Sequence, residues 1–283
     1  MDQSLSYSQL WHLLTPLYEA GEAKAIVRMV MESRFHLSTA DLLCYGSSLL
    51  TPEEQGELSG MMSRLAEAEP VQYVLGEAVF MDRWFHVERG VLIPRVETEV
   101  LCRWIVEETT SPCRMLDIGC GSGCIAVSLA LESPDAGVTA LDISSKALEV
   151  TGTNAARLGA HVELRQMDML NPEAWKSPKV DVVVSNPPYV CESERSAMHP
   201  NVLRHEPAEA LYVPDTDPLL FYRAIADYAR QTLGSGGRIY FECNPQYVEA
   251  VGEWLLDNGF SDLSYRDDPF GKNRFVRARL VYP

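Results

Sequence analysis

The residues best suited to chemistry are four consecutive ones that follow a β-branched run: Asn186, Pro187, Pro188 and Tyr189. The run at 180–185 predicts a buried parallel strand. Proline cannot donate to a sheet, so this strand must end at Ser185 or Asn186. Open α/β sheets bind ligands at the carboxyl ends of their strands. There, an amide, rigid carbonyls and an aromatic face would grip a planar –NH2 group. Taken alone, the tetrapeptide could equally be a proline-stiffened turn.

A glycine-rich turn follows an earlier predicted strand at 114–118. Its residues are Gly119, Cys120, Gly121, Ser122 and Gly123. Glycines permit a tight turn and let the backbone approach a ligand closely. The dinucleotide fingerprint would need glycine at position 124, where Cys124 stands, and no Gly-Lys-Ser/Thr follows to make a P-loop. A purely structural turn remains the alternative.

Two further strand ends carry acidic residues. Asp142 ends the next predicted strand, about 20 residues past the glycines, where a ribose diol is commonly held. Asp168 and Met169 follow the strand after it, and offer an acceptor for an adenine amino group and an apolar contact for its ring. Either acid could instead cap a turn or a helix. Nucleoside-compatible groups at four successive strand ends favour a cofactor site over four unrelated turns.

The elements that would position these residues alternate along the second half of the chain. We expect strands at 114–118, 137–141, 161–165, 180–185, 237–242 and 274–281, and helices at 97–107, 124–132, 145–158, 219–233 and 247–258. Such alternation indicates an α/β fold with a doubly wound, mostly parallel sheet and helices on both faces.

The front of the chain has a different pattern. Residues 1–75 show apolar residues at helical spacing, with helix starts predicted at Ser38 and Thr51. We expect a helical domain at 1–75, which either binds a partner or only stabilises the rest. A β-hairpin linker should follow at 76–95, with one strand in 78–87 and another in 90–94, before the domain at 96–283.

Composition narrows the classes of function. The 283 residues carry a formal net charge of −16, which argues against unaided binding along a nucleic-acid backbone. No apolar run approaches the ~20 residues of a membrane helix, and the N-terminus lacks signal-peptide features. The seven cysteines contain no C-x-x-C and favour reduced thiols over a disulfide framework or a zinc site. We expect a cytoplasmic protein without a metal.

These motifs together resemble class I S-adenosylmethionine-dependent methyltransferases that modify –NH2 groups, with a Rossmann-like fold. Flanking segments narrow the resemblance to the protein-glutamine methyltransferases of peptide chain release factors (the PrmC/HemK family). These segments are 70–76 (Pro-Val-Gln-Tyr-Val-Leu-Gly), 91–99 (Val-Leu-Ile-Pro-Arg-Val-Glu-Thr-Glu), 205–207 (His-Glu-Pro) and 271–276 (Gly-Lys-Asn-Arg-Phe-Val). The likeness covers nearly the whole chain.

The resemblance implies methyl transfer from S-adenosylmethionine to the glutamine of the Gly-Gly-Gln motif in release factors, in support of translation termination. It places the cofactor on Gly119–Gly123, Asp142, Asp168, Met169 and Asn186. It places the glutamine on Asn186, Pro187, Pro188 and Tyr189. It further implies substrate docking by residues 1–75 and a protein partner. From hydropathy and charge we expect no membrane and no direct nucleic acid, and we take a monomer as the default.

The chain departs from the family pattern at three places. Val96 replaces a proline, 213–218 replaces a glycine-rich turn, and Glu242-Cys243-Asn244 replaces Glu-x-Gly. We expect none of these to touch the chemistry. Two other functions stay open at this point. One is an amino-methyltransferase of nucleic-acid bases (N6-adenine or N2-guanine), which would flip a base into the pocket. The other is a catalytically silent cofactor-binding scaffold.

Overall fold

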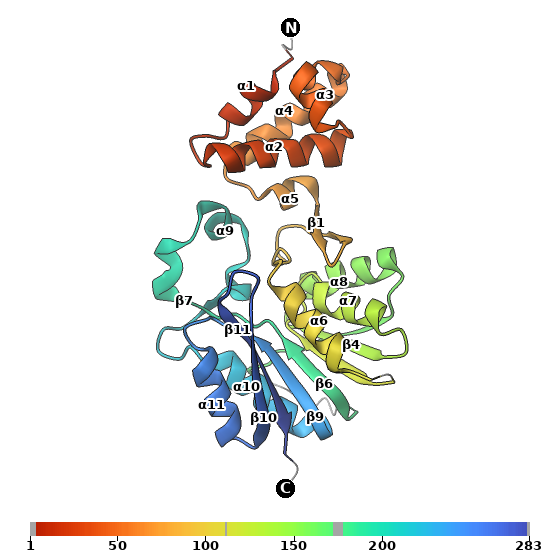
Figure 1. Cartoon of the computed structure of the whole chain (residues 1–283), viewed down its shortest axis with the longest axis vertical. Coiled ribbons are helices and arrows are strands. Elements are labelled where there is room, and N and C mark those ends of the chain that lie inside the picture. Colours follow the sequence, from red (N-terminus) through yellow and green to blue (C-terminus); the bar gives the residue numbers. More distant parts are fainter. Residues whose placement is uncertain (1–3, 111, 172–177, 282–283) are drawn as a thin grey trace. The chain divides into compact units, whose positions relative to one another are not determined.

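The computed structural model describes residues 4–110, 112–171 and 178–281. The chain divides into two compact units (Figure 1). The smaller comprises Met1–Glu77 together with His199–His205, and the larger comprises Ala78–Met198 and Glu206–Pro283. Each unit has its own apolar core.

A seven-stranded sheet organises the described part of the larger unit, in the order β10-β11-β9-β6-β3-β4-β5. Five of its strands are parallel, whereas β11 and β10 are antiparallel additions at one edge. The strands are β3 (Arg114–Ile118), β4 (Gly137–Asp142), β5 (Val162–Gln166), β6 (Val180–Ser185), β9 (Leu233–Glu242), β10 (Phe260–Asp267) and β11 (Asn273–Leu280). The chain runs from β3 outward through β4 and β5, and returns to β6 on the other side of β3. This reversal is the point at which open sheets bind ligands.

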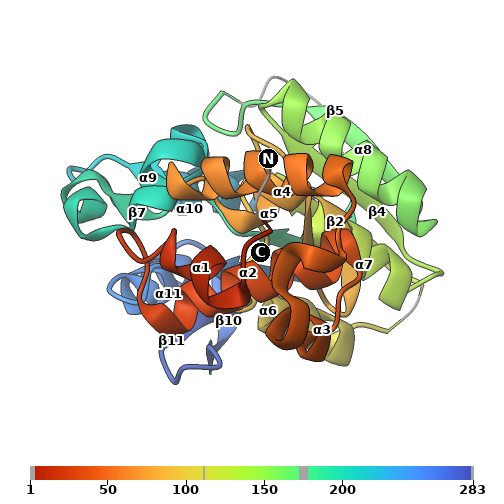
Figure 2. The ribbon, with the colours of Figure 1, turned by 90° about the horizontal axis from the view of Figure 1, so that it is seen from above.

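Successive side chains of the central strands enter two separate cores, as alternation along a strand requires. On β6, Val182 and Val184 belong to one core and Val183 to the other. Helices α6 (Thr98–Glu108), α7 (Cys124–Glu132) and α8 (Ser145–Leu158) cover the first face. Helices α10 (Leu220–Thr232) and α11 (Val248–Asp257) cover the second (Figures 1 and 2). Burial on both faces explains why these strands are continuous apolar runs.

The smaller unit is a helical bundle around a leucine- and methionine-rich core. Its elements are α1 (Tyr7–His12), α2 (Ala20–Phe35), α3 (Thr39–Tyr45), η1 (Gly46–Leu49), α4 (Pro52–Ala66), α5 (Val71–Leu75) and α9 (Pro200–His205). Ser38 and Thr51 cap α3 and α4 through capping boxes, as predicted. Within this unit the His199 ring stacks on Tyr18, with 5.4 Å between centroids.

One expectation about the elements was wrong, and one strand was missed. The hairpin is made by β1 (Glu77–Phe80) and β2 (Arg83–His86), and residues 91–94 belong to no strand. Its turn places Met81 and Asp82 at positive φ without the Asn or Gly that usually marks such a turn. The strand β10 was not predicted, because its sequence, Phe-Ser-Asp-Leu-Ser-Tyr-Arg-Asp, is polar enough to pass for a loop.

The remaining short elements are β7 (Val190–Cys191), η2 (Glu192–Ala197), η3 (Ala208–Ala210) and β8 (Tyr212–Val213). All seven cysteines are free thiols. In the described ranges no helix is both long and apolar enough to cross a bilayer. The same ranges hold no cluster of three His, Cys, Asp or Glu side chains placed to bind a metal ion.

Candidate active site

A cavity of about 280 Å³ opens in the larger unit at the carboxyl ends of its parallel strands. Gly119 and Gly121 reach it from β3, Asp142 from β4, and residues 167–170 from β5. Residues 185–188 reach it from β6. The structure thus brings together the four strand ends that the sequence singled out, at the reversal of strand order.

The glycine-rich turn presents bare backbone to this cavity. Gly119 and Gly121 have φ of +75° and +55°, and a Cβ built on either would meet nothing within 4 Å. The Gly121 N–H donates to Asp142 Oδ2 over 2.9 Å, and the Ser144 N–H donates to Oδ1 over 2.9 Å. Burial raises the pKa of Asp142, and these backbone donors act in the opposite direction. Each carboxylate oxygen keeps lone pairs for a ligand hydroxyl.

The other three residues of the turn face the protein and do not line the cavity. Cys120 Sγ lies 3.3 Å from Thr151 Oγ1. A Cβ on Gly123 would come within 2.7 Å of Thr151 Cγ2, so glycine there permits close packing of α7 on α8. The Ser122 carbonyl accepts from Asn154 Nδ2 over 2.9 Å. The expected cofactor contacts of Cys120, Ser122 and Gly123 stay predictions. Such contacts would have to be made by the backbone atoms of these residues.

Asn154 was missed by the sequence reasoning. Its side chain also exchanges hydrogen bonds with the backbone of His86, by donating to the carbonyl over 2.9 Å and accepting from the N–H over 2.6 Å. It therefore ties the β-hairpin to the glycine turn. Only its polarity on an apolar helix face hinted at such a role.

The adenine end expected at Asp168 and Met169 lies at the mouth of β5. Both residues line the cavity together with Ile143. The Asp168 carboxylate accepts from the Leu170 N–H over 2.9 Å and from Asn171 Nδ2 over 2.8 Å. It is a turn cap, as the alternative interpretation had it, and it also lies on the wall of the cavity.

Part of the cavity lining comes from segments to which we had assigned no site. It consists of Val91, Leu92, Pro207, Glu209, Ala210, Phe221 and Ile225. Two of these segments are fastened by Glu206, which is 7 % exposed. Its Oε1 lies 2.7 Å from Arg95 Nη2, and its Oε2 accepts from the Ile93 N–H over 3.2 Å.

Three of the four residues of the Asn-Pro-Pro-Tyr tetrapeptide line the cavity, and the fourth does not. Asn186, Pro187 and Pro188 line the cavity. The Ser185 hydroxyl anchors their base by donating to the Ile118 carbonyl over 2.6 Å. Tyr189 is not among the lining residues; its ring packs on the α10–β9 core, and its hydroxyl donates to Glu242 Oε1 over 3.1 Å. Burial and the Glu242 charge raise the pKa of Tyr189, so this phenol stays protonated.

The segment 242–244, where we expected a departure that does not touch the chemistry, lies against the tetrapeptide. Glu242 accepts from Tyr189, and Asn244 Nδ2 donates to the Tyr189 carbonyl over 3.2 Å. Both residues lie at the end of β9, next to β6 in the sheet. Glu242 matches the family's Glu-x-Gly pattern, whereas Asn244 replaces its glycine, and this altered residue is in direct contact with the tetrapeptide.

The cavity suits S-adenosylmethionine. The open space beside the backbone of Gly119 and Gly121 is available to a ligand, because neither residue has a side chain to fill it. Asp142 offers a carboxylate to a diol, and Ile143 and Met169 offer apolar contact to a purine ring. Asn186 and Pro187 also line the cavity and offer hydrogen-bond acceptors to a second molecule.

Comparisons with known proteins agree with this geometry. A family model described as a methyltransferase small domain matches residues 96–211, and one described as a PrmC N-terminal domain matches 13–76. A release factor glutamine methyltransferase of Bacteroides thetaiotaomicron is 41% identical over 265 residues, which are 94% of this chain and 95% of that protein. One of Flavobacterium psychrophilum is 34% identical over 278 residues, 96% and 97% of the two chains.

A solved structure extends the agreement to the fold. The ribosomal protein L11 methylase of Lactobacillus delbrueckii superimposes with a TM-score of 0.51 at 18% identity, over 72% of this chain and 90% of that one. At this identity the likeness concerns the fold alone. The two curated relatives, by contrast, match along almost their whole length. This chain therefore belongs to the family of release factor glutamine methyltransferases, which are S-adenosylmethionine-dependent enzymes.

Proposed function

We propose that this chain transfers a methyl group from S-adenosylmethionine to the side-chain amide nitrogen of the glutamine in the Gly-Gly-Gln motif of release factors. The observation that carries the proposal is that Asn186, Pro187 and the open glycine turn line the same cavity. The relatives named for this activity support the choice of substrate. We place the reaction in the cytoplasm, with the enzyme as a monomer.

The residues divide between the two ligands. Gly119 and Gly121 would hold the amino-acid end of the cofactor, Asp142 its ribose, and Asp168 and Met169 its adenine. S-adenosylmethionine would supply a methyl carbon bonded to a positively charged sulfur; attack of the nitrogen lone pair on that carbon breaks the carbon–sulfur bond and leaves S-adenosylhomocysteine. A carboxamide nitrogen is a poor nucleophile because its lone pair is delocalised into the carbonyl. The protein must therefore orient it well.

Asn186 Oδ1 and the Pro187 carbonyl would accept hydrogen bonds from the glutamine –NH2. Two such acceptors fix the plane of the amide and stabilise the positive charge that develops on nitrogen. Tyr189 stabilises the Asn-Pro-Pro-Tyr segment, which we call the tip, because its ring packs on the core and its hydroxyl donates to Glu242. Proton loss to solvent follows methyl transfer, when the nitrogen is far more acidic.

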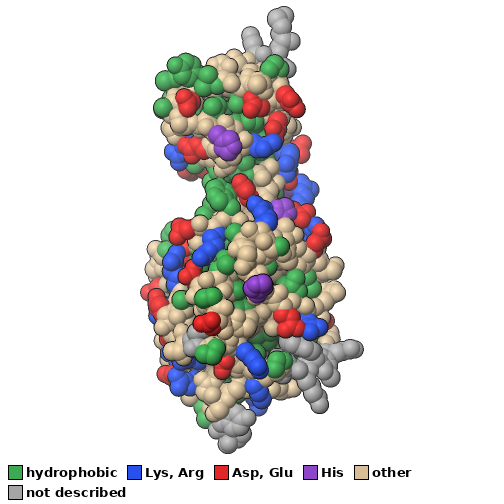
Figure 3. All heavy atoms as spheres, turned by 90° about the vertical axis from the view of Figure 1, so that its right-hand side faces the viewer, with side chains coloured by type: hydrophobic (Ala, Val, Ile, Leu, Met, Phe, Trp, Pro, Cys, Tyr) green, Lys and Arg blue, Asp and Glu red, His purple; other side chains and the backbone are tan. Residues whose placement is uncertain are grey.

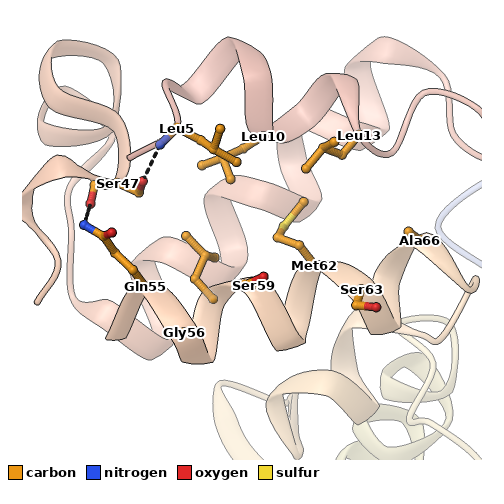
Figure 4. Close-up of a pocket in the computed structure, with 11 residues that line it drawn as sticks. Leu5, Leu10, Leu13, Ser47, Gln55, Gly56, Ser59, Met62, Ser63 and Ala66 are labelled. Atoms are coloured by element: carbon orange, nitrogen blue, oxygen red, sulfur yellow. Dashed lines mark hydrogen bonds between the residues drawn. The ribbon is translucent and has the colours of Figure 1, made fainter. Parts of the chain in front are cut away.

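The helical bundle of the smaller unit is proposed as the docking domain for the release factor. It contains a groove of about 490 Å³ between α1, η1 and α4 (Figure 4). Leu5, Leu10, Leu13 and Met62 line it, and Ser47 holds its end by accepting from the Leu5 N–H over 2.8 Å. An apolar groove of this kind fits the apolar face of a protein segment.

Methylation of a nucleic-acid base is the competing use of the Asn-Pro-Pro-Tyr tip. On the face of the larger unit visible in Figure 3, Lys and Arg side chains are interspersed with acidic and neutral ones. The formal charge of the chain is −16. Both observations favour a protein substrate over a phosphate backbone.

Transfer of a labelled methyl group decides the question. The purified chain is incubated with methyl-labelled S-adenosylmethionine and a release factor, the same factor with its Gly-Gly-Gln glutamine replaced, DNA, or ribosomal RNA. We expect label in the unaltered factor alone, at that glutamine. Label in a nucleic acid would establish the competing function, and cofactor binding without any transfer would establish a silent scaffold.

A further inference from the structure

A buried carboxylate lies behind the proposed amide-binding tip. Glu242, at the end of β9, is 1% exposed. Its Oε2 accepts from the Thr98 hydroxyl over 2.6 Å, and its Oε1 accepts from the Tyr189 hydroxyl over 3.1 Å. Thr98 is the first residue of α6 and is itself 2% exposed. The Glu242 carboxylate is therefore hydrogen-bonded both to Tyr189 of the tip and to Thr98 of α6.

The direction of these hydrogen bonds follows from counting protons. An ionised carboxylate only accepts, and a threonine hydroxyl has one proton to give. The Thr98 hydroxyl donates its proton to the hydrogen bond with Glu242, so it can only accept a hydrogen bond from any other partner. Its second partner is Asn186, whose Nδ2 lies 3.5 Å from Thr98 Oγ1. The amide must therefore turn its –NH2 towards Thr98, which leaves Oδ1 as the atom available to a ligand.

Nothing else in the shape of the side chain fixes this orientation. The oxygen and nitrogen ends of a carboxamide are nearly the same size, so a half-turn about the last bond costs little in packing. It would reverse the chemistry, because the –NH2 of Asn186 would then face the –NH2 of the substrate, donor against donor. A long bond of this kind commonly tightens once the substrate is bound.

We propose that Glu242 is a positioning residue, which acts through Thr98 to hold the Asn186 amide with Oδ1 facing the substrate. The proposal rests on the proposed function, since it needs a substrate whose methyl-accepting nitrogen carries hydrogens that Asn186 Oδ1 can bind. It assigns to Thr98 and Glu242 a role that neither had from the sequence, where they lie 88 and 56 positions from Asn186.

The proposal needs an ionised Glu242, and its two hydroxyl donors, Thr98 and Tyr189, are the partners that such a carboxylate requires. Burial raises the pKa of Glu242, and the Thr98 hydrogen bond, the charge of Arg274 and the Tyr189 hydrogen bond counteract part of that rise. Arg274 Nη1 also lies 3.4 Å from the Tyr189 hydroxyl, which can accept from it while donating to Glu242. A buried charge is a poor way to gain stability. Its presence here is better explained by what it orients.

Three substitutions test this chain of hydrogen bonds from Glu242 through Thr98 to Asn186, which we call the relay. Glu242→Gln keeps the shape but introduces a donor, Thr98→Val keeps the shape but removes the hydroxyl, and Thr98→Ser keeps the hydroxyl. We expect the first two to lower kcat at least tenfold, with the KM for the release factor and the Kd for S-adenosylhomocysteine within twofold of the wild type. Thr98→Ser should retain most of kcat.

The matched control is Thr232→Val. It removes a hydroxyl that is also buried, at 3% exposure, but donates only to backbone carbonyls within α10. We expect its kcat to be unchanged. Wild-type kcat in Thr98→Val or Glu242→Gln overturns the relay, as does an equal loss in Thr98→Ser and Thr98→Val. If Glu242→Gln does not fold, the Thr98 pair decides alone.

The same measurements separate this inference from the proposed function. If the wild-type chain transfers no methyl group to a release factor, the proposed function fails first. If the wild type transfers it and the variants transfer it equally well, only the relay is wrong.

Discussion

Asn244 donates from Nδ2 to the backbone carbonyl of Tyr189 over 3.2 Å. The same nitrogen lies 2.9 Å from Glu194 Oε2, which also accepts from the Cys191 N–H over 2.9 Å. Asn244 is 5% exposed, so these bonds are largely shielded from water. They fasten the segment that follows the tetrapeptide to the end of β9. A glycine here, as in the family pattern, would have no side chain with which to do so.

We therefore predict that Asn244→Ala loosens the tip. Loss of a buried hydrogen bond costs about 1 kcal/mol, or about fivefold in an equilibrium or rate. We expect kcat/KM for the release factor to fall by about that factor, with cofactor affinity unchanged. Gln246→Ala is the control, because exposed Gln246 donates to Glu194 Oε1 over 3.2 Å without that bond reaching Tyr189. Equal losses in the two variants would show that Glu194, and not the Tyr189 carbonyl, matters.

A second prediction concerns Asn186 itself. Asn186→Ala removes the amide acceptor but none of the glycine turn or Asp142. We expect kcat to fall by more than about a hundredfold, the loss typical of removing one preorganised polar group from a reacting centre. Cofactor affinity, measured by calorimetric titration with S-adenosylhomocysteine, should weaken only modestly.

Asn258→Ala serves as its control. Asn258 Nδ2 donates to the Trp254 carbonyl at the end of α11 over 2.7 Å, and Asn258 does not line the cavity. Wild-type turnover in Asn186→Ala would refute the assignment of Asn186, whatever the result for Asn258.

A third prediction separates cofactor contact from backbone strain at the glycine turn. Gly119 and Gly159 share a φ of +75°, and a Cβ on either meets nothing within 4 Å. Gly119 lines the cavity, whereas Gly159 caps the end of α8. Alanine should therefore destabilise the free protein by a similar amount at both positions, about 1 kcal/mol.

Only Gly119→Ala should weaken S-adenosylhomocysteine binding, by about tenfold or more, because its methyl group would occupy the space meant for the ligand. Thermal unfolding without ligand checks the first expectation and calorimetry the second. A Gly159→Ala variant that binds the ligand equally poorly would mean that strain alone explains the effect.

The parts of the site that the sequence predicted are those encoded within a few neighbouring residues. A glycine turn after a strand, an acid at a strand end and two prolines after an apolar run each have a local physical signature. The order of strands then follows from alternation of strand and helix. These features sufficed to place Gly119, Asp142, Asp168 and Asn186 on one edge of the sheet, and the structure has them around one cavity.

The supporting contacts could not be predicted in this way. Thr98, Asn154, Glu206 and Glu242 contact residues 32 to 144 positions away, from Asn154 and Ser122 at the short end to Thr98 and Glu242 at the long end. Their partners depend on which strands become neighbours and on the register between them. A buried acid in an apolar strand was the one available signal, since such a group needs a partner. It indicates that a partner exists but does not identify it.

Asp117 provides a prediction about pH. It is fully buried, and Oδ2 accepts from the Ala126 N–H over 3.1 Å. Burial raises its pKa from 3.8 to about 7, although that hydrogen bond acts in the other direction. The folded protein therefore binds this proton more tightly than the unfolded chain. The resulting stability is complete below pH 3.8 and is lost as the pH rises to about 7.

Asp117→Asn should remove this dependence. The free energy of unfolding of the wild type should fall relative to that of the variant between pH 4 and pH 7, by at most about 1.4 kcal/mol per pH unit. Urea unfolding of the ligand-free proteins across this range measures it. Asp181→Asn is the control, because Asp181 accepts one backbone N–H at 2.8 Å but is exposed. Parallel curves for the wild type and Asp117→Asn would contradict the prediction.

The last prediction tests the docking role of the helical bundle. Leu13 lines the groove of the smaller unit (Figure 4) and is 50% exposed. Leu43 on α3 is 65% exposed and is not among the residues that line the groove. Leu13→Ala should raise the KM for the intact release factor about fivefold or more, the loss expected of an apolar anchor at an interface. The activity on a short peptide that carries only the Gly-Gly-Gln loop should not change, because such a peptide lacks the segment that would fill the groove. Leu43→Ala should leave both activities at the wild-type value. Equal KM values for Leu13→Ala and the wild type would mean that the bundle only stabilises the chain.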